Sequence, residues 1–187
     1  MLKRTIGLYL KYLVAKWRYR GKVKFNGFSV VYAFHNSLID FDLGGGITIN
    51  SHPLSNMVGL SQRTIIVARY GGKIHIGSGC GISGSTIYAY DNIEIGNNVL
   101  IGGNCKIIDN DFHQLSAQDR TENNPDKIKR APILIGDGCF IGANSIILKG
   151  TTLGKNVVVG AGSVVHGTFP DNVIIAGNPA RVVKENN

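Results

Sequence analysis

An aliphatic residue recurs at every sixth position between residues 135 and 165. The repeating residues are Ile135, Ile141, Ile147, Leu153, Val159 and Val165, and a glycine directly follows four of them. A period of six fits neither a helix of 3.6 residues per turn nor the two-residue alternation of a simple strand. It is typical of a hexapeptide β-helix, in which each repeat forms one short strand and one corner. The sequence therefore predicts an all-β solenoid of triangular coils, with aliphatic side chains stacked inside and glycines at tight corners.

The same period is present earlier in the chain, with two interruptions. Its register residues there are Ile76, Ile82 and Tyr88, then, after a slip of one residue, Ile95, Ile101 and Ile107. The pattern breaks at Asp109, and residues 114–131 are polar and without a period. A long insertion in a solenoid is usually a functional loop. We therefore expect a protruding loop at about 114–131, and a second, irregular loop at 50–63.

The first 22 residues are expected to form a separate amphipathic helix before a β-helix domain at 23–187. Apolar residues fall at helical spacing, at Leu2, Ile6, Tyr9, Leu13 and Trp17, with basic residues between them. Such a stripe packs on the end of the β-helix or on a neighbouring subunit. The alternative is a peripheral contact of residues 1–21 with an anionic membrane surface. Charges interrupt every apolar run, so we expect neither a secretory signal nor a membrane span.

The formal net charge of +8 is compatible with an anionic partner. Nucleic acid is not expected, because the basic cluster of Lys127, Lys129 and Arg130 has no aromatic stacking platform or binding motif beside it. The three cysteines each follow a repeat residue by four positions, which predicts small packed thiols and a cytoplasmic protein. These are Cys80, Cys105 and Cys139.

The repeat breaks at the sequence Asp109-Asn110-Asp111-Phe112-His113. A histidine titrates near neutral pH, so it can accept a proton from an alcohol and return it. A carboxylate on its other ring nitrogen would fix the tautomer, and both Asp111 and Asp109 are candidates. A β-helix metalloenzyme of the γ-carbonic anhydrase type would need three imidazoles, of which His75 and His113 supply only two. No histidine pair has short ligand spacing, so no metal is expected.

Together, the motifs DNDFH, PILIGDGCFIGANSIILKG, VGAGSVV and AGNPARVV resemble the hexapeptide-repeat acyltransferases with a left-handed parallel β-helix. The resemblance covers about residues 72–184. The branch it is most similar to is that of the sugar O-acetyltransferases of capsule, exopolysaccharide and lipopolysaccharide assembly, related to the maltose and galactoside acetyltransferases. It implies a homotrimer that binds acetyl-coenzyme A between adjacent β-helices. It also implies that His113 deprotonates the acceptor hydroxyl, without an acyl-enzyme.

The resemblance also assigns binding residues. Ala143, Gly160 and Ala161 match positions that meet the pantetheine arm, and Arg181 and Lys184 match cations near the phosphates. Ser85, with Ser83 as the substitute, matches an acceptor contact; the alternative is that both serines are ordinary corner residues.

Two departures from the family pattern concern the coenzyme contacts. Phe140 stands where much of the family has tryptophan. His166-Gly167 replaces a common Thr-Lys after the run GAGSVV.

From the resemblance we expect an acetyl-coenzyme A-dependent O-acetyltransferase acting on a sugar hydroxyl in surface-polysaccharide biosynthesis. The alternatives are a serine or antibiotic acetyltransferase, or a non-catalytic β-helix scaffold. The expected location is the cytoplasm. The alternative is a peripheral location at the inner membrane face, with residues 1–21 in contact with the membrane.

Overall fold

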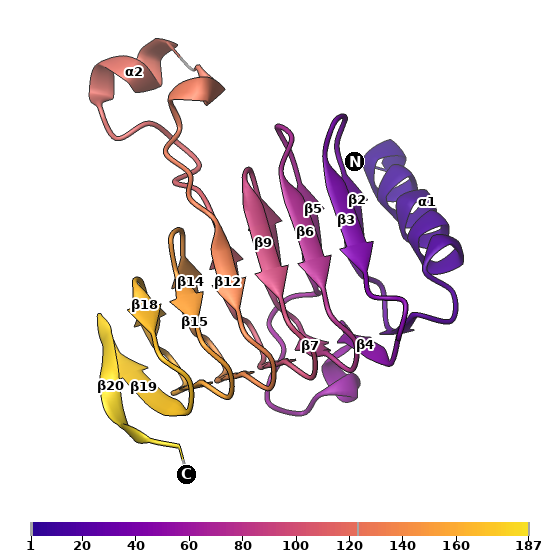
Figure 1. Ribbon diagram of the computed structural model, residues 1–187. Helices are drawn as coiled ribbons and strands as arrows, with labels where there is room; N and C mark the ends of the chain where they lie inside the picture. The colour runs from indigo at the N-terminus through magenta and orange to yellow at the C-terminus, as the bar shows by residue number, and fades with distance from the viewer. Residues whose placement is uncertain (1, 123, 187) are drawn as a thin grey trace.

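The computed structural model describes residues 2–122 and 124–186, with side chains described from Ile6 onward. Met1, Asn123, Asn187 and the side chain of Leu2, which the sequence predictions include, therefore lie outside the description. Figure 1 shows a stack of triangular coils with one helix at its N-terminal end and a loop that protrudes from one edge.

Three sheets form the walls of the prism, and each pairs every third strand. All pairs are parallel except the last. Sheet A contains β1 (Val23–Asn26), β4 (Ile47–Asn50), β7 (Gly81–Ser83), β10 (Leu100–Ile101), β13 (Phe140–Ile141), β16 (Val158–Val159), β19 (Val173–Gly177) and β20 (Ala180–Glu185). Sheet B contains β2 (Val30–Ala33), β5 (Ile65–Ala68), β8 (Thr86–Ala89), β11 (Lys106–Ile108), β14 (Ile146–Leu148) and β17 (Val164–Val165). Sheet C contains β3 (Leu38–Phe41), β6 (Lys73–Ile76), β9 (Asn92–Ile95), β12 (Ile133–Ile135), β15 (Thr152–Leu153) and β18 (Thr168–Phe169).

In each coil the chain passes from sheet A to sheet B and then to sheet C. The six strands of sheets B and C define six coils. We call the line of corners between sheets A and B the A/B edge, and the line between sheets B and C the B/C edge. Every site residue predicted from the sequence, apart from the C-terminal cations, lies on or next to one of these two edges.

The predicted aliphatic repeat forms the core. Ile141 pairs in register with Val159 and Ile147 with Val165, and all four side chains are buried. Burying each such side chain contributes on the order of 1.5–3 kcal/mol, so stacked repeats stabilise one another along the whole prism.

The three cysteines are free and buried, as predicted. Their thiols lie close to glycine carbonyls of the neighbouring coil, as from Cys139 Sγ to Gly154 O at 3.1 Å. Burial raises the pKa of the Cys139 thiol to about 11.

The predicted register is wrong at one position. Ile87, not Tyr88, points into the core: Ile87 is fully buried, whereas Tyr88 is only partly so. The cause is a short corner at Gly84, whose φ of 49° turns the chain one residue earlier than in the next coil. Ile87 therefore pairs with Ile107, and the Tyr88 ring lies outside the prism.

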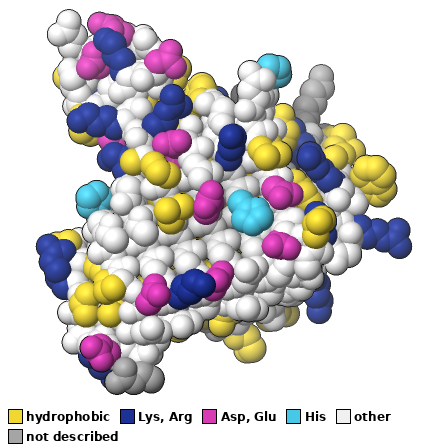
Figure 2. All heavy atoms as spheres, in the orientation of Figure 1, with side chains coloured by type: hydrophobic (Ala, Val, Ile, Leu, Met, Phe, Trp, Pro, Cys, Tyr) yellow, Lys and Arg dark blue, Asp and Glu magenta, His cyan; other side chains and the backbone are white. Residues whose placement is uncertain are grey.

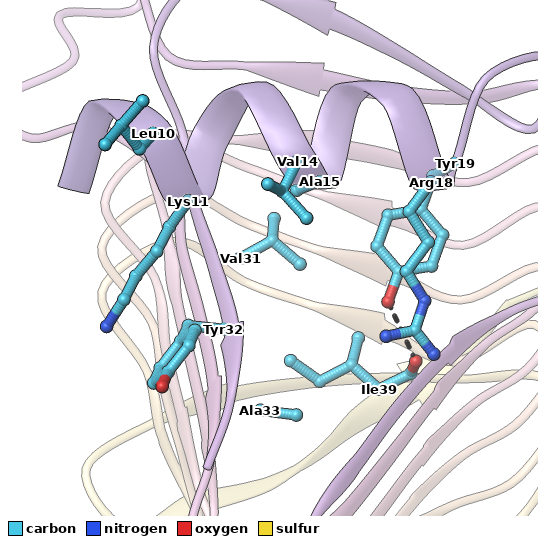
Figure 3. Close-up of a pocket in the computed structure, with 10 residues that line it drawn as sticks. All are labelled: Leu10, Lys11, Val14, Ala15, Arg18, Tyr19, Val31, Tyr32, Ala33 and Ile39. Atoms are coloured by element: carbon cyan, nitrogen blue, oxygen red, sulfur yellow. Dashed lines mark hydrogen bonds between the residues drawn. The ribbon is translucent and has the colours of Figure 1, made fainter. Parts of the chain in front are cut away.

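The helix α1 (Leu2–Arg18) packs over the first coil, but not through the predicted apolar stripe. Tyr12 and Ala15 are buried, whereas the stripe residues Ile6, Tyr9, Leu13 and Trp17 are exposed. Tyr12 and Tyr19 are buried beneath it, and the Tyr19 hydroxyl donates a hydrogen bond to Ile39 O at 3.0 Å (Figure 3). A pocket of 270 Å³ lies between the helix and strands β2 and β3. None of the helices described in the structure is long and apolar enough to span a bilayer.

At the C-terminal end, β20 turns back and pairs antiparallel with β19. The sequence predicted a closing strand and a short tail there, but not this reversal. The final hairpin covers the last coil on sheet A.

Candidate active site

The long insertion leaves and re-enters the prism at one place on the B/C edge of the fourth coil. Its neck is a short antiparallel pair: Asp111 N donates to Lys129 O at 3.1 Å, and Ala131 N donates to Asp109 O at 3.0 Å. Beyond the neck the loop contains α2 (Ala117–Glu122) and the 3₁₀ turn η2 (Pro125–Lys127). The predicted protruding loop is confirmed, although its helices were not predicted.

The loop carries charges of both signs, as Figure 2 shows at its tip. Lys127, one of the three basic residues singled out in the sequence, contacts Asp119 at 2.7 Å and Glu122 at 2.6 Å. Its charge is therefore compensated within the loop.

His113 lies at the base of this loop and is exposed. A tight turn places it there: Phe112 N donates to Asn110 Oδ1 at 2.9 Å, and His113 N donates to Asp111 O at 2.7 Å. Phe112 has a φ of 59°, a left-handed conformation that is rare for an aromatic residue and marks a constrained backbone. Among the described residues, the imidazole has no hydrogen-bond partner, so its nitrogens are available to a ligand.

Asp109 does not orient His113, which corrects one of the two sequence assignments. Its carboxylate is fully buried and accepts hydrogen bonds from Tyr90 N and Asp91 N, both at 2.8 Å. Asn110 Nδ2 donates to the same carboxylate at 3.0 Å. Burial raises the pKa of Asp109, while these donors act in the opposite direction. Both oxygens therefore hold the corner that precedes the loop.

Asp111 remains the candidate for orienting His113. One carboxylate oxygen forms a salt bridge with Lys149, just after β14. The other, Oδ2, is buried and has no hydrogen-bond partner among the described residues. An unpaired buried acceptor is costly unless a donor completes it, and an imidazole N–H from the same turn is the donor that the sequence predicted. Lys149 was missed, because a single lysine after a repeat strand carries no distinctive signal.

The residues matched to the coenzyme arm lie on the A/B edge, at the corners of the fifth and sixth coils. Ala161 is exposed, and Ala143 and Gly160 are half-buried. The corners stack closely, with Gly162 N donating to Ala143 O at 2.9 Å. At Gly142, a Cβ would lie 2.5 Å from Ala161 N, so only glycine fits between these corners. At these two coils the edge presents backbone rather than large side chains, whereas in the second coil the same edge carries the loop at residues 51–64.

Arg181 and Lys184 lie on β20 and are exposed. Lys184 pairs in register with Ile174 of β19, so both cations lie on the C-terminal hairpin of sheet A. Phe140 is exposed on the same sheet, whereas His166 lies on the B/C edge of the sixth coil. Of the two departures from the family pattern, only Phe140 therefore lies near the A/B edge.

Ser85 does not contact an acceptor, because it is fully buried at the A/B corner of the third coil. Its hydroxyl lies 2.8 Å from Gly102 O and accepts from Cys105 N at 2.9 Å. The substitute, Ser83, is nearly buried, and its oxygen accepts from Asn50 Nδ2 and Asn56 Nδ2 at 3.2 and 2.9 Å. Both serines are corner residues, which is the alternative that the sequence left open.

His113 and the coenzyme residues lie on different edges of one molecule. His113 is on the B/C edge, and Ala143, Gly160 and Ala161 are on the A/B edge, with the full width of sheet B between them. A single copy therefore does not bring the predicted base and the predicted coenzyme residues together. Among the described residues, no group of three His, Cys, Asp or Glu side chains is arranged to hold a metal ion.

The chain is similar in sequence to known hexapeptide-repeat proteins and acetyltransferases. The model of the hexapeptide repeat of succinyl-transferase matches residues 132–166. Galactoside O-acetyltransferase of Escherichia coli is 36% identical over 119 residues, 63% of this chain and 57% of that protein. A putative lipopolysaccharide biosynthesis O-acetyl transferase of Escherichia coli is 34% identical over 106 residues, 54% of each chain. The chain spans about half the length of the curated relatives it matches.

Solved structures extend the likeness to the fold. A maltose O-acetyltransferase from Clostridium difficile superposes with a TM-score of 0.51 at 28% identity, over 84% of this chain and 70% of that one. The resemblance inferred from the sequence and the predicted left-handed parallel β-helix are thus both confirmed.

Proposed function

Since the chain belongs to the hexapeptide-repeat acyltransferase family, we propose that it is an acetyl-coenzyme A-dependent O-acetyltransferase that acts on a sugar hydroxyl in surface-polysaccharide biosynthesis. The observation that carries this proposal is the environment of His113. An unpartnered imidazole lies exposed where the repeat opens into a loop, in the same turn as a carboxylate with a buried free oxygen. This pairing suits a general base.

In the proposed reaction, His113 removes the proton from the acceptor hydroxyl. The hydroxyl oxygen attacks the thioester carbonyl, the new C–O bond forms and the C–S bond breaks. The imidazolium then returns its proton to the leaving thiolate. We propose that Asp111 Oδ2, which has no partner among the described residues, accepts a hydrogen bond from the second ring nitrogen in the reacting complex and stabilises the imidazolium while it carries charge. General-base assistance of this kind contributes about a hundred- to ten-thousand-fold in rate.

The donor is acetyl-coenzyme A, bound as a substrate along the A/B edge. The exposed backbone of Ala143, Gly160 and Ala161 lets a slender pantetheine arm lie against the prism. Arg181 and Lys184, on the hairpin at the end of the same sheet, counter the phosphate charges. The buried thiols take no part, because burial keeps their pKa values raised and their sulfurs inside the core.

A homotrimer would unite the two edges. In a closed ring of three, the B/C edge of one copy faces the A/B edge of the next, so every site takes His113 from one subunit and the coenzyme corners from its neighbour. The separation of these residues within one copy supports this assembly.

The acceptor class is tested by an assay of thiol release from acetyl-coenzyme A, with sugars, serine and aminoglycosides as acceptors. Release with sugars alone supports the proposal. Release with serine or an aminoglycoside alone would favour the serine or antibiotic alternative.

A calorimetric titration with coenzyme A tests the remaining alternative, a non-catalytic scaffold. Binding at one site per subunit supports the proposed enzyme, and no heat of binding would favour the scaffold.

Helix α1 supports a location at the inner membrane face. Leu13 and Trp17, four residues apart, are exposed, and Trp17 is 80% exposed. Lys16 and Arg18 accompany them, so an apolar stripe with basic flanks is exposed. Co-sedimentation with anionic vesicles, but not with zwitterionic ones, is the expected result, with loss of binding in Trp17→Ser. Equal recovery in the supernatant with both lipids would contradict this location.

A further inference from the structure

An aromatic residue stands on the B/C edge in each of the first four coils. Tyr70 and Tyr90 lie with ring centroids 4.7 Å apart, and Tyr88 lies 5.5 Å from Tyr90 and 4.9 Å from Phe112. We call the set Phe34, Tyr70, Tyr88, Tyr90 and Phe112 the aromatic edge. Its last ring belongs to the residue directly before His113.

Arg69 completes this row between the first and second coils. Its guanidinium carbon lies 4.6 Å from the Phe34 ring centroid and 4.8 Å from that of Tyr70. Arg69 also donates a hydrogen bond to the Tyr70 hydroxyl at 3.3 Å. Rings in edge-on and tilted contact, together with a planar cation, therefore form one continuous strip from the helical end of the prism to the proposed base.

Three of the five rings in the strip are exposed, whereas Tyr88 is partly buried and Tyr90 is buried. Phe34, Tyr70 and Phe112 are 39%, 46% and 38% exposed. Tyr70 and Phe112 also have positive φ values of 52° and 59°; the other positive-φ non-glycine residues in the described chain are all asparagines, which tolerate this conformation. Two aromatic residues that are held in a strained backbone and exposed in a single copy, on the edge that lines the proposed cleft between copies, indicate a role beyond packing within one prism.

Two adjoining grooves run along the strip and share Tyr70 and Gly71. The first, of 440 Å³, is lined by Phe34, His35 and Arg69. The second, of 590 Å³, is lined by polar and charged groups around Tyr90, namely Lys73, Asp91, Asn92, Glu94 and Arg130. Apolar rings thus lie beside hydrogen-bonding side chains that carry positive and negative charges.

We propose that the aromatic edge is an acceptor subsite for an elongated glycan, which the enzyme acetylates within a chain of several sugar units rather than as a free monosaccharide. The inference rests on the proposed function. Sugar rings have one apolar face of C–H groups that packs on an aromatic ring, and a rim of hydroxyls that hydrogen-bond to groups such as those of the second groove. Neighbouring coils rise by about 4.8 Å, so four coils span about 14 Å, enough for a short oligosaccharide.

The glycan approaches from the N-terminal side. In the fifth and sixth coils the B/C corners carry Lys149-Gly150 and His166-Gly167 instead of aromatic residues. Toward the other end the row continues through Tyr32, 4.7 Å from Phe34, to Lys11 of helix α1, whose ammonium lies 3.5 Å from the Tyr32 ring. The chain being modified therefore extends from His113 toward the helix.

An array of mono- to hexasaccharide fragments of bacterial capsule and O-antigen repeats tests the proposal. The wild-type protein should bind fragments of three or more units and not the monosaccharides. Tyr70→Ala and Phe34→Ala should each weaken retention about tenfold, the loss that one aromatic stack of roughly 1.4 kcal/mol predicts. Leu43→Ala, an 85% exposed residue away from the edge, should bind as the wild type does. Thermal midpoints verify that each variant folds.

His113→Ala separates this proposal from the proposed function. It should lose acetyl transfer and keep glycan retention, because the strip binds without the base. If the wild-type protein shows no transferase activity but its glycan retention depends on Tyr70, the proposed acetyltransferase function is refuted and the glycan subsite is supported. The subsite is refuted if the folded wild-type protein binds no fragment, or binds monosaccharides as well as hexasaccharides, or if both aromatic variants bind like Leu43→Ala.

Discussion

The A/B and B/C edges are built by one repeat and differ in what they expose. At the A/B edge, Ser85, Ser145 and Ser163 occupy equivalent buried slots and bond to the backbone of the same or the next coil. At the B/C edge, the corners carry large side chains, and one of them opens into a loop of more than twenty residues.

The difference separates two tasks that a catalyst of this kind needs. In the fifth and sixth coils the A/B edge exposes backbone along which a long, thin substrate can lie, and it tolerates few substitutions there because each corner is packed against the next. In the second coil the same edge carries the loop at residues 51–64, so its regularity is confined to the C-terminal coils. An irregular edge carries the side chains that perform chemistry and recognition, since its corners are free to vary. If both tasks belong to one reaction, neither edge is active without the other.

The largest effect is expected from removing the base on the B/C edge. His113→Ala should lower kcat about a hundred- to ten-thousand-fold and leave the affinity for coenzyme A unchanged, because the A/B edge is untouched. Thiol-release kinetics and calorimetry measure the two quantities. His75→Ala is the matched control, since His75 is exposed on sheet C, with Asp40 at 3.5 Å, and lies on neither of the two edges. Wild-type turnover in His113→Ala would remove this residue from catalysis.

Mixing two inactive variants tests whether the edges act across subunits. Ala161→Trp should block the A/B edge with little damage to the core, because Ala161 is exposed. When this variant is co-refolded with His113→Ala, about one quarter of the sites in random trimers should combine two intact edges. Activity should therefore return to about a quarter of the wild-type value. If the mixture stays as inactive as its components, both edges serve one subunit and the trimeric site is excluded.

The two aspartates at the loop neck should respond in opposite ways. Asp109→Ala leaves Tyr90 N and Asp91 N without acceptors, so we expect a loss of about 2–5 kcal/mol in the free energy of unfolding. Asp111→Asn should lower kcat at least about tenfold and change stability little, because Lys149 can still reach water. Denaturant titration and thiol-release assays compare the pair. Equal losses of stability would mean that Asp111 is a second structural carboxylate.

Most of the fold followed from the sequence because the repeat is an interior property. Ile135, Ile141 and their successors are buried as the period predicted, and the cysteines fill the slot assigned to small residues. The register error at Tyr88 has a local cause, since a corner shortened at Gly84 leaves both Ile87 and Tyr88 as plausible core residues. The six-residue period identifies the repeating core positions. The length of a single corner decides where the register of those positions shifts.

The site was predicted less completely because it depends on neighbours in space. The location of His113 at the broken coil followed from the sequence, but the choice between Asp109 and Asp111 needed the backbone donors of Tyr90 and Asp91. The aromatic edge was missed for a similar reason. Successive members are between 2 and 36 residues apart in sequence, and only the stacking of coils aligns them.

The smallest effect is expected at a corner of the A/B edge. Ser85→Ala removes the acceptor for Cys105 N, so the free energy of unfolding should fall by about 1–3 kcal/mol. The KM for the sugar acceptor should stay unchanged, because the buried hydroxyl meets no substrate. Ser116→Ala, exposed in the protruding loop, controls for the loss of a serine hydroxyl without a structural role. A rise in acceptor KM at wild-type stability would mean that Ser85 contacts the acceptor. The A/B edge would then bind substrate through side chains as well as through its backbone.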